Sequence, residues 1–272
     1  MASRKGTRVI INTYNKKAKE HIKAILRDFL DDDGAAECAE PLLTCVDELV
    51  KNAIKANYKY LVIRREIARR VFNRKLADGV RLRMGKEHFE RAAVEIAKDG
   101  NVSAKVREIL DQESVYIALS NRAYDEKREF DGEEQKKISS LDRFQSIRKE
   151  IRGGEIKTIL AIERRNGRLS ITVTNTAPIL TRDLQRIEEK RREYIQYLAE
   201  GREHEFFINN IDTSESGFGL GYAVITSCLC GLGIQADEAL VIEPSDETTV
   251  RLLVSTEKMR HSTDREVELV PV

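Results

Sequence analysis

Residues 47–57 read Asp-Glu-Leu-Val-Lys-Asn-Ala-Ile-Lys-Ala-Asn, which combines an apolar helical pattern with a row of polar side chains. On a helix, Glu48, Asn52 and Lys55 lie at positions i, i+4 and i+7, so they share one face. A carboxylate can accept a proton, an Asn carbonyl oxygen can bind a hard cation such as Mg²⁺, and a Lys ammonium can meet phosphate oxygens. The stretch therefore indicates either a site for a phosphorylated ligand or an ordinary polar helix face.

A second motif, residues 217–225, reads Gly-Phe-Gly-Leu-Gly-Tyr-Ala-Val-Ile. Glycine at every second position lets the main chain approach a ligand closely, and the apolar run behind it predicts a helix. A glycine loop at a helix N-terminus offers unpaired N–H groups to a phosphate. The spacing matches neither the dinucleotide-binding fingerprint nor the Walker loop. A tight turn without a ligand is the alternative interpretation.

A third motif, residues 171–179, reads Ile-Thr-Val-Thr-Asn-Thr-Ala-Pro-Ile, an alternating strand that ends in a polar turn. Such a turn can point Asn175 and Thr176 into a pocket, although turn formation alone explains the same residues. The Asn166-Gly167 pair predicts a hairpin turn before this strand. Further strands are predicted at 8–12, 158–162, 239–242 and 250–254, and helices near 18–30, from 35 or 41 to 53, and at 182–200.

The composition predicts a globular chain. Hydrophobic residues make up 41% of the 272 residues and charged residues 34%, so the chain can bury a core. No apolar run approaches the roughly 20 residues of a membrane helix. Four cysteines without the spacing of a disulfide framework, and a first segment without an apolar signal core, favour a cytoplasmic location.

Taken in order, the three motifs resemble the superfamily of gyrase, heat-shock-ninety chaperones, histidine kinases and MutL, the GHKL ATPases. The Glu-x-x-x-Asn-Ala-x-x-Ala pattern at 48–56 looks like its N box. Residues 216–225 look like its G2 box, in the form seen in histidine kinases. Residues 246–252 are similar to the closing strand of the same domain. The resemblance covers residues 8–57 and 155–255.

The resemblance implies an α+β fold, a two-layer α/β sandwich of the Bergerat type in which helices cover one face of a mixed sheet. Residues 1–57 and 154–258 would form this histidine-kinase-like ATP-binding domain. The superfamily connects the N box to the next strand through far fewer residues than this chain has. Residues 58–153 are therefore interpreted as a helical insertion that could bind a protein partner, and 259–272 as a C-terminal tail.

The resemblance also implies a site for ATP and Mg²⁺. Asn52 would hold the Mg²⁺, Glu48 would be the catalytic base, and Lys55 would approach the phosphates. Residues 180–216 would form a mobile lid. The other nucleotide-binding residues would be Asn175, Thr176, Gly217, Phe218, Gly219, Leu220, Gly221 and Thr249.

The third motif departs from the family pattern. The G1 box of the family usually reads Asp-x-Gly-x-Gly, and its Asp accepts a hydrogen bond from the adenine amino group. Asn175 stands at the Asp position, Ala177 replaces the first glycine, and the second glycine is missing. An Asn carbonyl oxygen can still accept from an amino group, but the lost charge and backbone freedom would weaken adenine binding.

Three functions remain open at this point. The first is a signalling kinase or ATPase that acts on a separate partner, which the intact Glu48 and Asn52 favour. The second is an ATP-gated binding module with little or no catalysis, which the altered G1 box favours. The third is a nucleic-acid-linked ATPase of the gyrase or MutL type, supported only by the basic stretch 64–75. A solvated helix face also explains that stretch, and the net charge of +1 predicts no overall attraction to nucleic acid.

Overall fold

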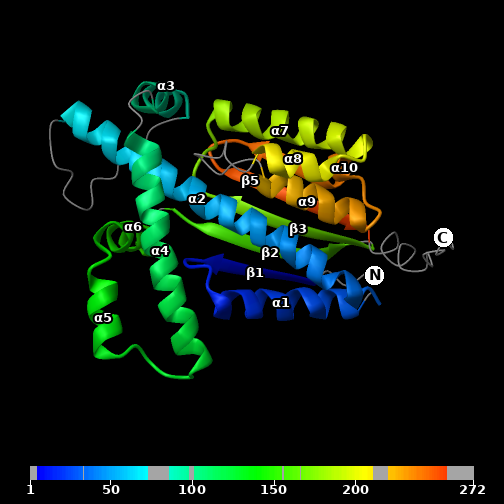
Figure 1. Cartoon of the computed structure of the whole chain (residues 1–272), viewed down its shortest axis with the longest axis horizontal. Coiled ribbons are helices and arrows are strands. Elements are labelled where there is room, and N and C mark those ends of the chain that lie inside the picture. Colours follow the sequence, from blue (N-terminus) through cyan, green and yellow to red (C-terminus); the bar gives the residue numbers. More distant parts are fainter. Residues whose placement is uncertain are drawn as a thin grey trace.

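A five-stranded sheet forms one layer of the protein (Figure 1). The structure is a computed structural model, and it describes residues 5–32, 34–72, 86–97, 101–154, 156–165, 167–210 and 220–255. The strands are β1 (Lys5–Ile11), β2 (Thr158–Arg165), β3 (Arg168–Asn175), β4 (Leu240–Pro244) and β5 (Thr248–Ser255). Their spatial order is β1-β2-β3-β5-β4.

All four strand pairs are antiparallel, so the expectation of a mixed sheet was wrong. The β2–β3 hairpin turns at Gly167, where φ is 70°, as the Asn166-Gly167 pair predicts. A short turn also joins β4 to β5. The sheet is antiparallel throughout because β5 pairs with β3 in the opposite direction. The edge strand β4 pairs with β5 in the same antiparallel way.

The two faces of the sheet differ. Alternate residues of β3 and β5 are buried, as expected for strands with one covered face. The helices α1 (Lys16–Asp31), α2 (Ala39–Phe72) and α9 (Leu220–Gly231) form the layer next to the sheet (Figure 1). On the other face, Ile10 and Val241 are 52% and 37% exposed. The α+β class and the two-layer arrangement are therefore confirmed.

The segment between β1 and α2 follows its predicted pattern. The Asn15 side chain caps α1 by accepting a hydrogen bond from the Ala18 backbone at 3.1 Å. The buried stripe of α1 consists of Ile22, Leu26, Phe29 and Leu30. The helix ends at Asp31, and Gly34 then takes a positive φ of 64° before the short 3₁₀ turn η1 (Ala36–Cys38).

The helix α2 runs through the predicted domain boundary at residue 57 without a break. Its second half carries the helices of the insertion, which are α3 (Lys86–Ala97), α4 (Asn101–Asp125), α5 (Gly132–Ser139) and α6 (Asp142–Arg152). The insertion shares one hydrophobic core with the sandwich, which includes Phe89, Val106 and Phe144. The insertion therefore extends the sandwich through a common helix.

Polar contacts fix the insertion to α2. The Tyr58 hydroxyl donates to Glu113 of α4 at 2.6 Å. Arg64 and Arg65 both pair with Glu150 of α6. These two arginines belong to the basic stretch 64–75, so this part of the stretch serves packing between helices; residues 73–75 lie outside the described part of the chain.

Two helices occupy the predicted lid, α7 (Thr181–Ala199) and α8 (Glu203–Asn210). They meet at Gly201, where φ is 68°. Tyr194, Phe206 and Ala223 form a small separate cluster between this pair and α9. Residues 211–216 of the predicted lid lie outside the described residues. The short helix α10 (Ala236–Ala239) leads from α9 into β4.

In the described residues, no helix is both long enough and apolar enough to cross a membrane.

Candidate functional site

The first two motifs meet where α9 begins against α2. A Cβ atom added to Gly221 would lie 2.7 Å from Glu48 Oε2 and 3.0 Å from Asn52 Nδ2. A Cβ at this position would force the ends of these two side chains to shift, so glycine allows the closest approach of α9 to α2. Residues about 170 positions apart in the chain thus place a carboxylate, a carboxamide and a glycine backbone side by side.

Neighbouring contacts hold this half of α2 in place. Tyr14 donates to Asp47 and Lys19 pairs with the same carboxylate, which ties α2 to the start of α1. Burial and the Asp47 carboxylate both raise the pKa of the Tyr14 hydroxyl. The Cys45 thiol contacts the Ile225 carbonyl oxygen of α9 at 3.9 Å. These contacts keep the Glu48 and Asn52 face of α2 against α9.

Glu48 keeps one oxygen toward α9. Its Oε1 accepts from Lys51 at 2.9 Å, an exposed pair one turn along the helix. Its Oε2 is the atom nearest to Gly221. The carboxylate is therefore directed to the place where the two motifs meet, as a proton acceptor at this position must be.

Lys55 lies one turn beyond Asn52, in a strongly positive environment. Burial is the largest cause that lowers its pKa to about 8, and the charges of Arg186, Lys59 and Arg107 lower it further. These three cations come from α7, α2 and α4. The helices of the sandwich, the predicted lid and the insertion thus bring positive charge to the same place.

The third motif forms a turn held from both sides. Asn175 is 3% exposed, and its Oδ1 accepts a hydrogen bond from the Ala177 backbone at 3.0 Å. The Ala177 carbonyl accepts from the Thr248 hydroxyl at 2.9 Å. Asn is suited to this turn because its side chain can replace a backbone acceptor two residues along. The Thr176 hydroxyl accepts from the Lys157 backbone at 2.7 Å and fastens the turn to the segment before β2.

The structure places Thr249 and Thr248 on opposite faces of β5. Its hydroxyl pairs with Thr174 at 3.2 Å on the sheet face away from the helices. Thr248, one position earlier, is buried and faces the helical layer. Successive strand residues point to opposite faces, so an error of one residue moves the side chain to the wrong side.

A row of buried polar residues under α2 was missed by the sequence analysis. Thr158, Asn175 and Thr248 are aligned across β2, β3 and β5. Asn57 of α2 donates to the Thr158 hydroxyl at 3.0 Å, and its own buried Oδ1 has no partner within the described part of the chain. Buried polar side chains in strands and in the apolar face of a helix were the signal that could have identified this row.

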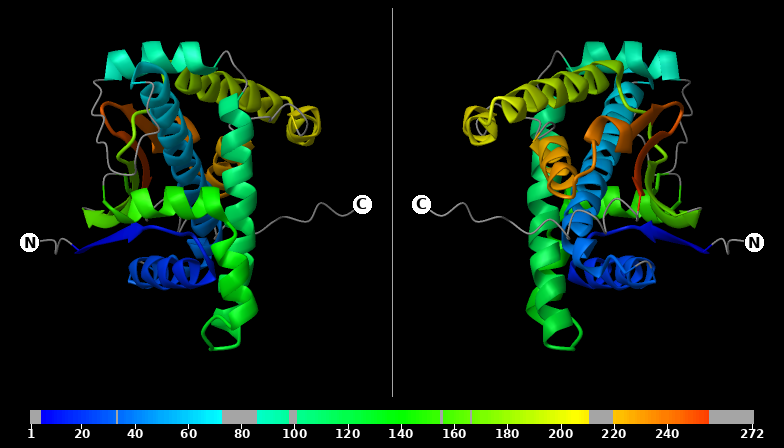
Figure 2. Two further views of the ribbon diagram at one scale, coloured as in Figure 1. Left: turned by 90° about the vertical axis from the view of Figure 1, so that its left-hand side faces the viewer. Right: turned by 90° about the vertical axis from the view of Figure 1, so that its right-hand side faces the viewer.

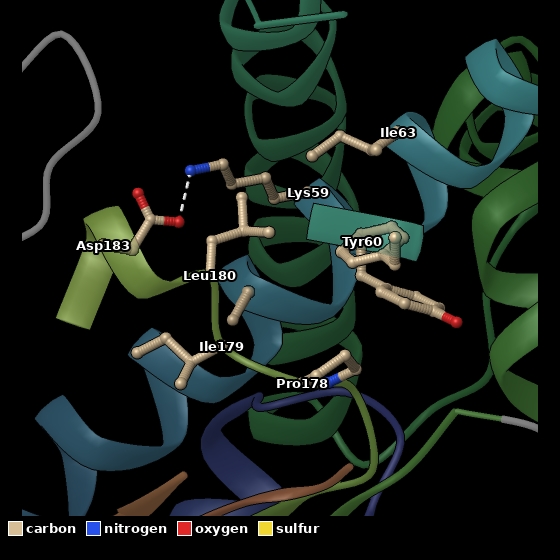
Figure 3. A pocket seen from close by; sticks show the side chains of 9 residues that line it. Lys59, Tyr60, Ile63, Pro178, Ile179, Leu180 and Asp183 are labelled. Atoms are coloured by element: carbon tan, nitrogen blue, oxygen red, sulfur yellow. Dashed lines mark hydrogen bonds and ion pairs between the residues drawn. The ribbon is translucent and has the colours of Figure 1, made fainter. Parts of the chain in front are cut away.

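A small cavity lies where the third motif leads into α7. It is lined by Pro178, Ile179 and Leu180 against residues of α2 and α3, and Figure 3 shows the Lys59 side chain extending toward Asp183 at its rim. The Lys59–Asp183 distance is 2.5 Å. The cavity volume of about 30 Å³ holds little more than a water molecule, so in this conformation it cannot take a nucleobase.

The remaining predicted residues are only partly placed. Gly217, Phe218 and Gly219 lie outside the described residues. Leu220 opens α9 and packs on the cluster around Tyr194. In the part of the chain with a described structure, no group of three His, Cys, Asp or Glu side chains could hold a metal ion. A cation at Asn52 would therefore need ligand oxygens from a bound phosphate or from water.

Comparisons with protein-family models, with curated proteins and with solved structures found no match.

Proposed function

We propose that this chain binds a nucleoside triphosphate, ATP in the first place, together with Mg²⁺. The observation that carries the proposal is the contact of Gly221 with Glu48 and Asn52. A glycine at this position lets the α9 backbone come close to both side chains, and a backbone that approaches a phosphate needs the same freedom. The resemblance of both motifs to the GHKL boxes supports the same function.

The residues present fit Mg²⁺ and a triphosphate. Mg²⁺ usually takes one or two protein oxygens and completes its octahedron with phosphates and water. Asn52 supplies an amide oxygen, and the Glu48 carboxylate lies beside it against Gly221. Bound Mg²⁺ would neutralise phosphate charge, while Asn52 orients the cation and Lys55 meets a phosphate.

The proposed activity is phosphate transfer or hydrolysis for a separate partner, in the manner of a histidine-kinase-like ATPase. Glu48 carries the role of base, because its Oε2 is directed to the meeting point of the two motifs. The adenine ring of the nucleotide would lie toward the turn at Asn175 and Thr248. This requires the cavity beside Leu180 to widen, because it is too small as it stands.

Isothermal titration calorimetry with ATP and Mg²⁺ tests binding. We expect a Kd in the micromolar range for the unmodified protein, and a loss of about tenfold or more in Asn52→Ala. Asn12→Ala is the matched control, because Asn12 is an exposed asparagine outside the site. If the unmodified protein binds no nucleotide, or if both variants bind equally well, the proposal is wrong.

An ATP-gated module without turnover is the second candidate. It is favoured by the Asn175 turn, where the oxygen expected to meet adenine already accepts from Ala177. Phosphate release in the unmodified protein and in Glu48→Gln separates the two functions. Turnover lost in Glu48→Gln with binding retained supports an ATPase, and binding without turnover in either protein supports the module.

A further inference from the structure

Two cysteines face each other where α9 packs on α2. Both views of the fold show α9, drawn in orange, beside the first half of α2, drawn in blue (Figure 1; Figure 2). The Cys45 thiol of α2 lies 3.9 Å from the backbone carbonyl oxygen of Ile225 in α9. Cys228 is three residues further along α9, and a helical side chain leans toward the N-terminus of its helix, over the preceding turn. The Cys228 thiol is therefore directed to the turn of α9 that the Cys45 thiol contacts.

The packing direction of the two helices brings Cys228 to the level of Cys45. Gly221, near the start of α9, meets Glu48 of α2. One turn further along α9, Ile225 meets Cys45, which precedes Glu48 on α2. The two helices are thus antiparallel, and Gly221, Ile225 and Cys228 share one face of α9 at positions i, i+4 and i+7. The two thiols share a hydrogen bond across this contact.

The two thiols differ in their access to solvent and in their acidity. Cys45 is buried, whereas Cys228 is partly exposed. The hydrogen bond from Cys45 lowers the pKa of the Cys228 thiol to about 7, while the same bond and burial raise the pKa of Cys45. An accessible thiolate is the form of cysteine that reacts with oxidants, and a neighbouring thiol can then resolve the product. Cys228 is suited to the first role and Cys45 to the second.

We propose that Cys228 and Cys45 form an oxidation site for hydroperoxides, at which a reversible disulfide joins α9 to α2. The Cys228 thiolate attacks one oxygen of hydrogen peroxide, so that an S–O bond forms, the O–O bond breaks, and the hydroxide that leaves is protonated by solvent. The Cys45 sulfur then attacks the Cys228 sulfur of this sulfenic acid. The S–S bond forms, the S–O bond breaks, and the leaving hydroxide takes the Cys45 proton as water. Two electrons thus pass from the two sulfurs to one peroxide.

The disulfide would act on the proposed nucleotide site, and this part of the inference rests on the proposed function. Cys45, Glu48 and Asn52 share one face of α2 at positions i, i+3 and i+7. Bonded sulfurs lie closer together than sulfurs in contact, so the bridge draws α9 toward this face. A Cβ atom at Gly221 already has no room unless the Glu48 and Asn52 side chains shift. Oxidation should therefore narrow the space that a phosphate would enter and weaken nucleotide binding.

Peptide mapping without reduction tests the oxidation site directly. The full-length protein is treated with hydrogen peroxide and digested, and mass spectrometry assigns the bonded cysteines from the fragment ions. We expect a cross-link between Cys45 and Cys228 that dithiothreitol removes. In Cys45→Ser, Cys228 should stop at the sulfenic acid, which dimedone labels. The matched control is Cys230→Ser, which removes the exposed cysteine two residues further along α9 and should form the same cross-link.

The decisive result comes from the unmodified protein, so it does not depend on the folding of a variant. A cross-link that uses Cys38 or Cys230 in place of either residue overturns the inference. A treated protein in which Cys45 keeps its free thiol overturns it as well.

Calorimetry with Mg²⁺-ATP compares the reduced and the oxidised protein. We expect oxidation to raise the Kd about fivefold or more, and dithiothreitol to restore it. Cys228→Ser treated with peroxide controls for other oxidations and should keep its affinity. If the cross-link forms and both forms of the unmodified protein bind equally well, the disulfide does not control the site and that part of the inference is wrong. If the cross-link forms but the reduced protein binds no nucleotide, the oxidation site stands and the proposed function fails.

Discussion

The sandwich and the insertion bury different kinds of polar group. In the sandwich, Thr158, Asn175 and Thr248 form a row at one end of three strands, and the buried Asn57 oxygen above them has no partner among the described residues. In the insertion, the buried carboxyls are paired within the fold. Glu113 accepts from Tyr58, and Glu134 accepts from Arg128 and caps α5 together with Asp131.

The paired carboxyls of the insertion and the Asn57 oxygen of the sandwich are expected to have different roles. A buried carboxyl with strong partners stabilises a particular packing, and it leaves little capacity for a further bond. An unpaired buried amide oxygen lowers stability and is expected where another function requires it. The account therefore predicts that changes in the two regions will affect different measurements.

Gly221→Ala should give the largest effect. The new Cβ would meet Glu48 Oε2 at 2.7 Å and Asn52 Nδ2 at 3.0 Å. We expect a loss of nucleotide affinity of about 100-fold and a stability loss of about 1 kcal/mol, because the ends of the Glu48 and Asn52 side chains must shift. Gly231→Ala at the other end of α9 is the control, since nothing lies within 4 Å of its Cβ. Calorimetry and urea unfolding measure both effects, and equal binding by the two variants would contradict the account.

Tyr58→Phe should affect the insertion without affecting the ligand. It removes the 2.6 Å hydrogen bond to the buried Glu113 carboxyl, and we expect a loss of about 2 kcal/mol with nucleotide affinity within about twofold of the unmodified protein. Tyr124→Phe, at an exposed position of α4, should leave stability unchanged. A large loss of affinity in Tyr58→Phe would show that the two regions are not separate in this way.

The loss in Tyr58→Phe should depend on pH. Burial raises the pKa of Glu113, and the hydrogen bond from Tyr58 opposes that shift. A carboxyl whose folded pKa is raised loses stability as pH rises above its ordinary value of about 4.5. Without the hydroxyl the pKa rises further, so we expect urea unfolding to show a larger penalty at pH 7 than at pH 4.5. An equal penalty at both pH values would mean that Glu113 does not titrate in this range.

Thr248→Val and Thr249→Val compare the two faces of one strand. Thr248 donates to the Ala177 carbonyl at 2.9 Å beneath the helices, so its loss should cost about 1 kcal/mol and weaken nucleotide binding severalfold. Thr249 lies on the open face, and its replacement should change stability by less than about 0.5 kcal/mol. Thermal unfolding and calorimetry test both variants. A larger loss of nucleotide affinity in Thr249→Val than in Thr248→Val would assign the nucleotide contact to Thr249.

The smallest expected effect is the pH dependence of anion binding. Lys55 has a pKa of about 8, lowered by burial and by Arg186, Lys59 and Arg107, while Asp183 pairs with Lys59. A neutral Lys55 attracts a phosphate less strongly, so the affinity for Mg²⁺-ATP should fall severalfold as pH rises through about 8 to 9. Lys55→Met should bind more weakly at pH 7 and lose this step.

The same group gives stability an opposite trend. Between about pH 8 and the ordinary lysine value of 10.5, the unfolded chain holds a proton on Lys55 that the folded chain has lost. Stability without ligand should therefore rise with pH in this window, and less so in Lys55→Met. Anion binding that is independent of pH in the unmodified protein would remove Lys55 from the site.

Local patterns explain which parts of this fold could be predicted. The β2–β3 hairpin followed from strict alternation and the Asn166-Gly167 turn, and α1 from its apolar spacing and its end at Asp31. The boundary predicted at residue 57 does not interrupt α2, which continues without a stop signal while Tyr58, Leu61 and Ile67 face a new set of partners. What changes at residue 57 is the set of elements that α2 contacts, and the local sequence pattern does not record those contacts.

The candidate site was predictable in its parts and not in its geometry. Glu48, Asn52 and Lys55 share a face of α2 as helical spacing requires. The choice between Thr248 and Thr249 depends on strand register, and two adjacent threonines carry no signal to decide it. The positions of Arg107 and Gly221 depend on how helices from distant segments pack, so they became visible only in the structure.

Hydrogen–deuterium exchange with and without Mg²⁺-ATP tests the central claim most directly, because one experiment reports on the sandwich and the insertion together. We predict slower exchange at 48–56 of α2 and 220–226 of α9, while α5 at 132–139 exchanges as before. No change in α2 and α9 at saturating Mg²⁺-ATP would contradict the account.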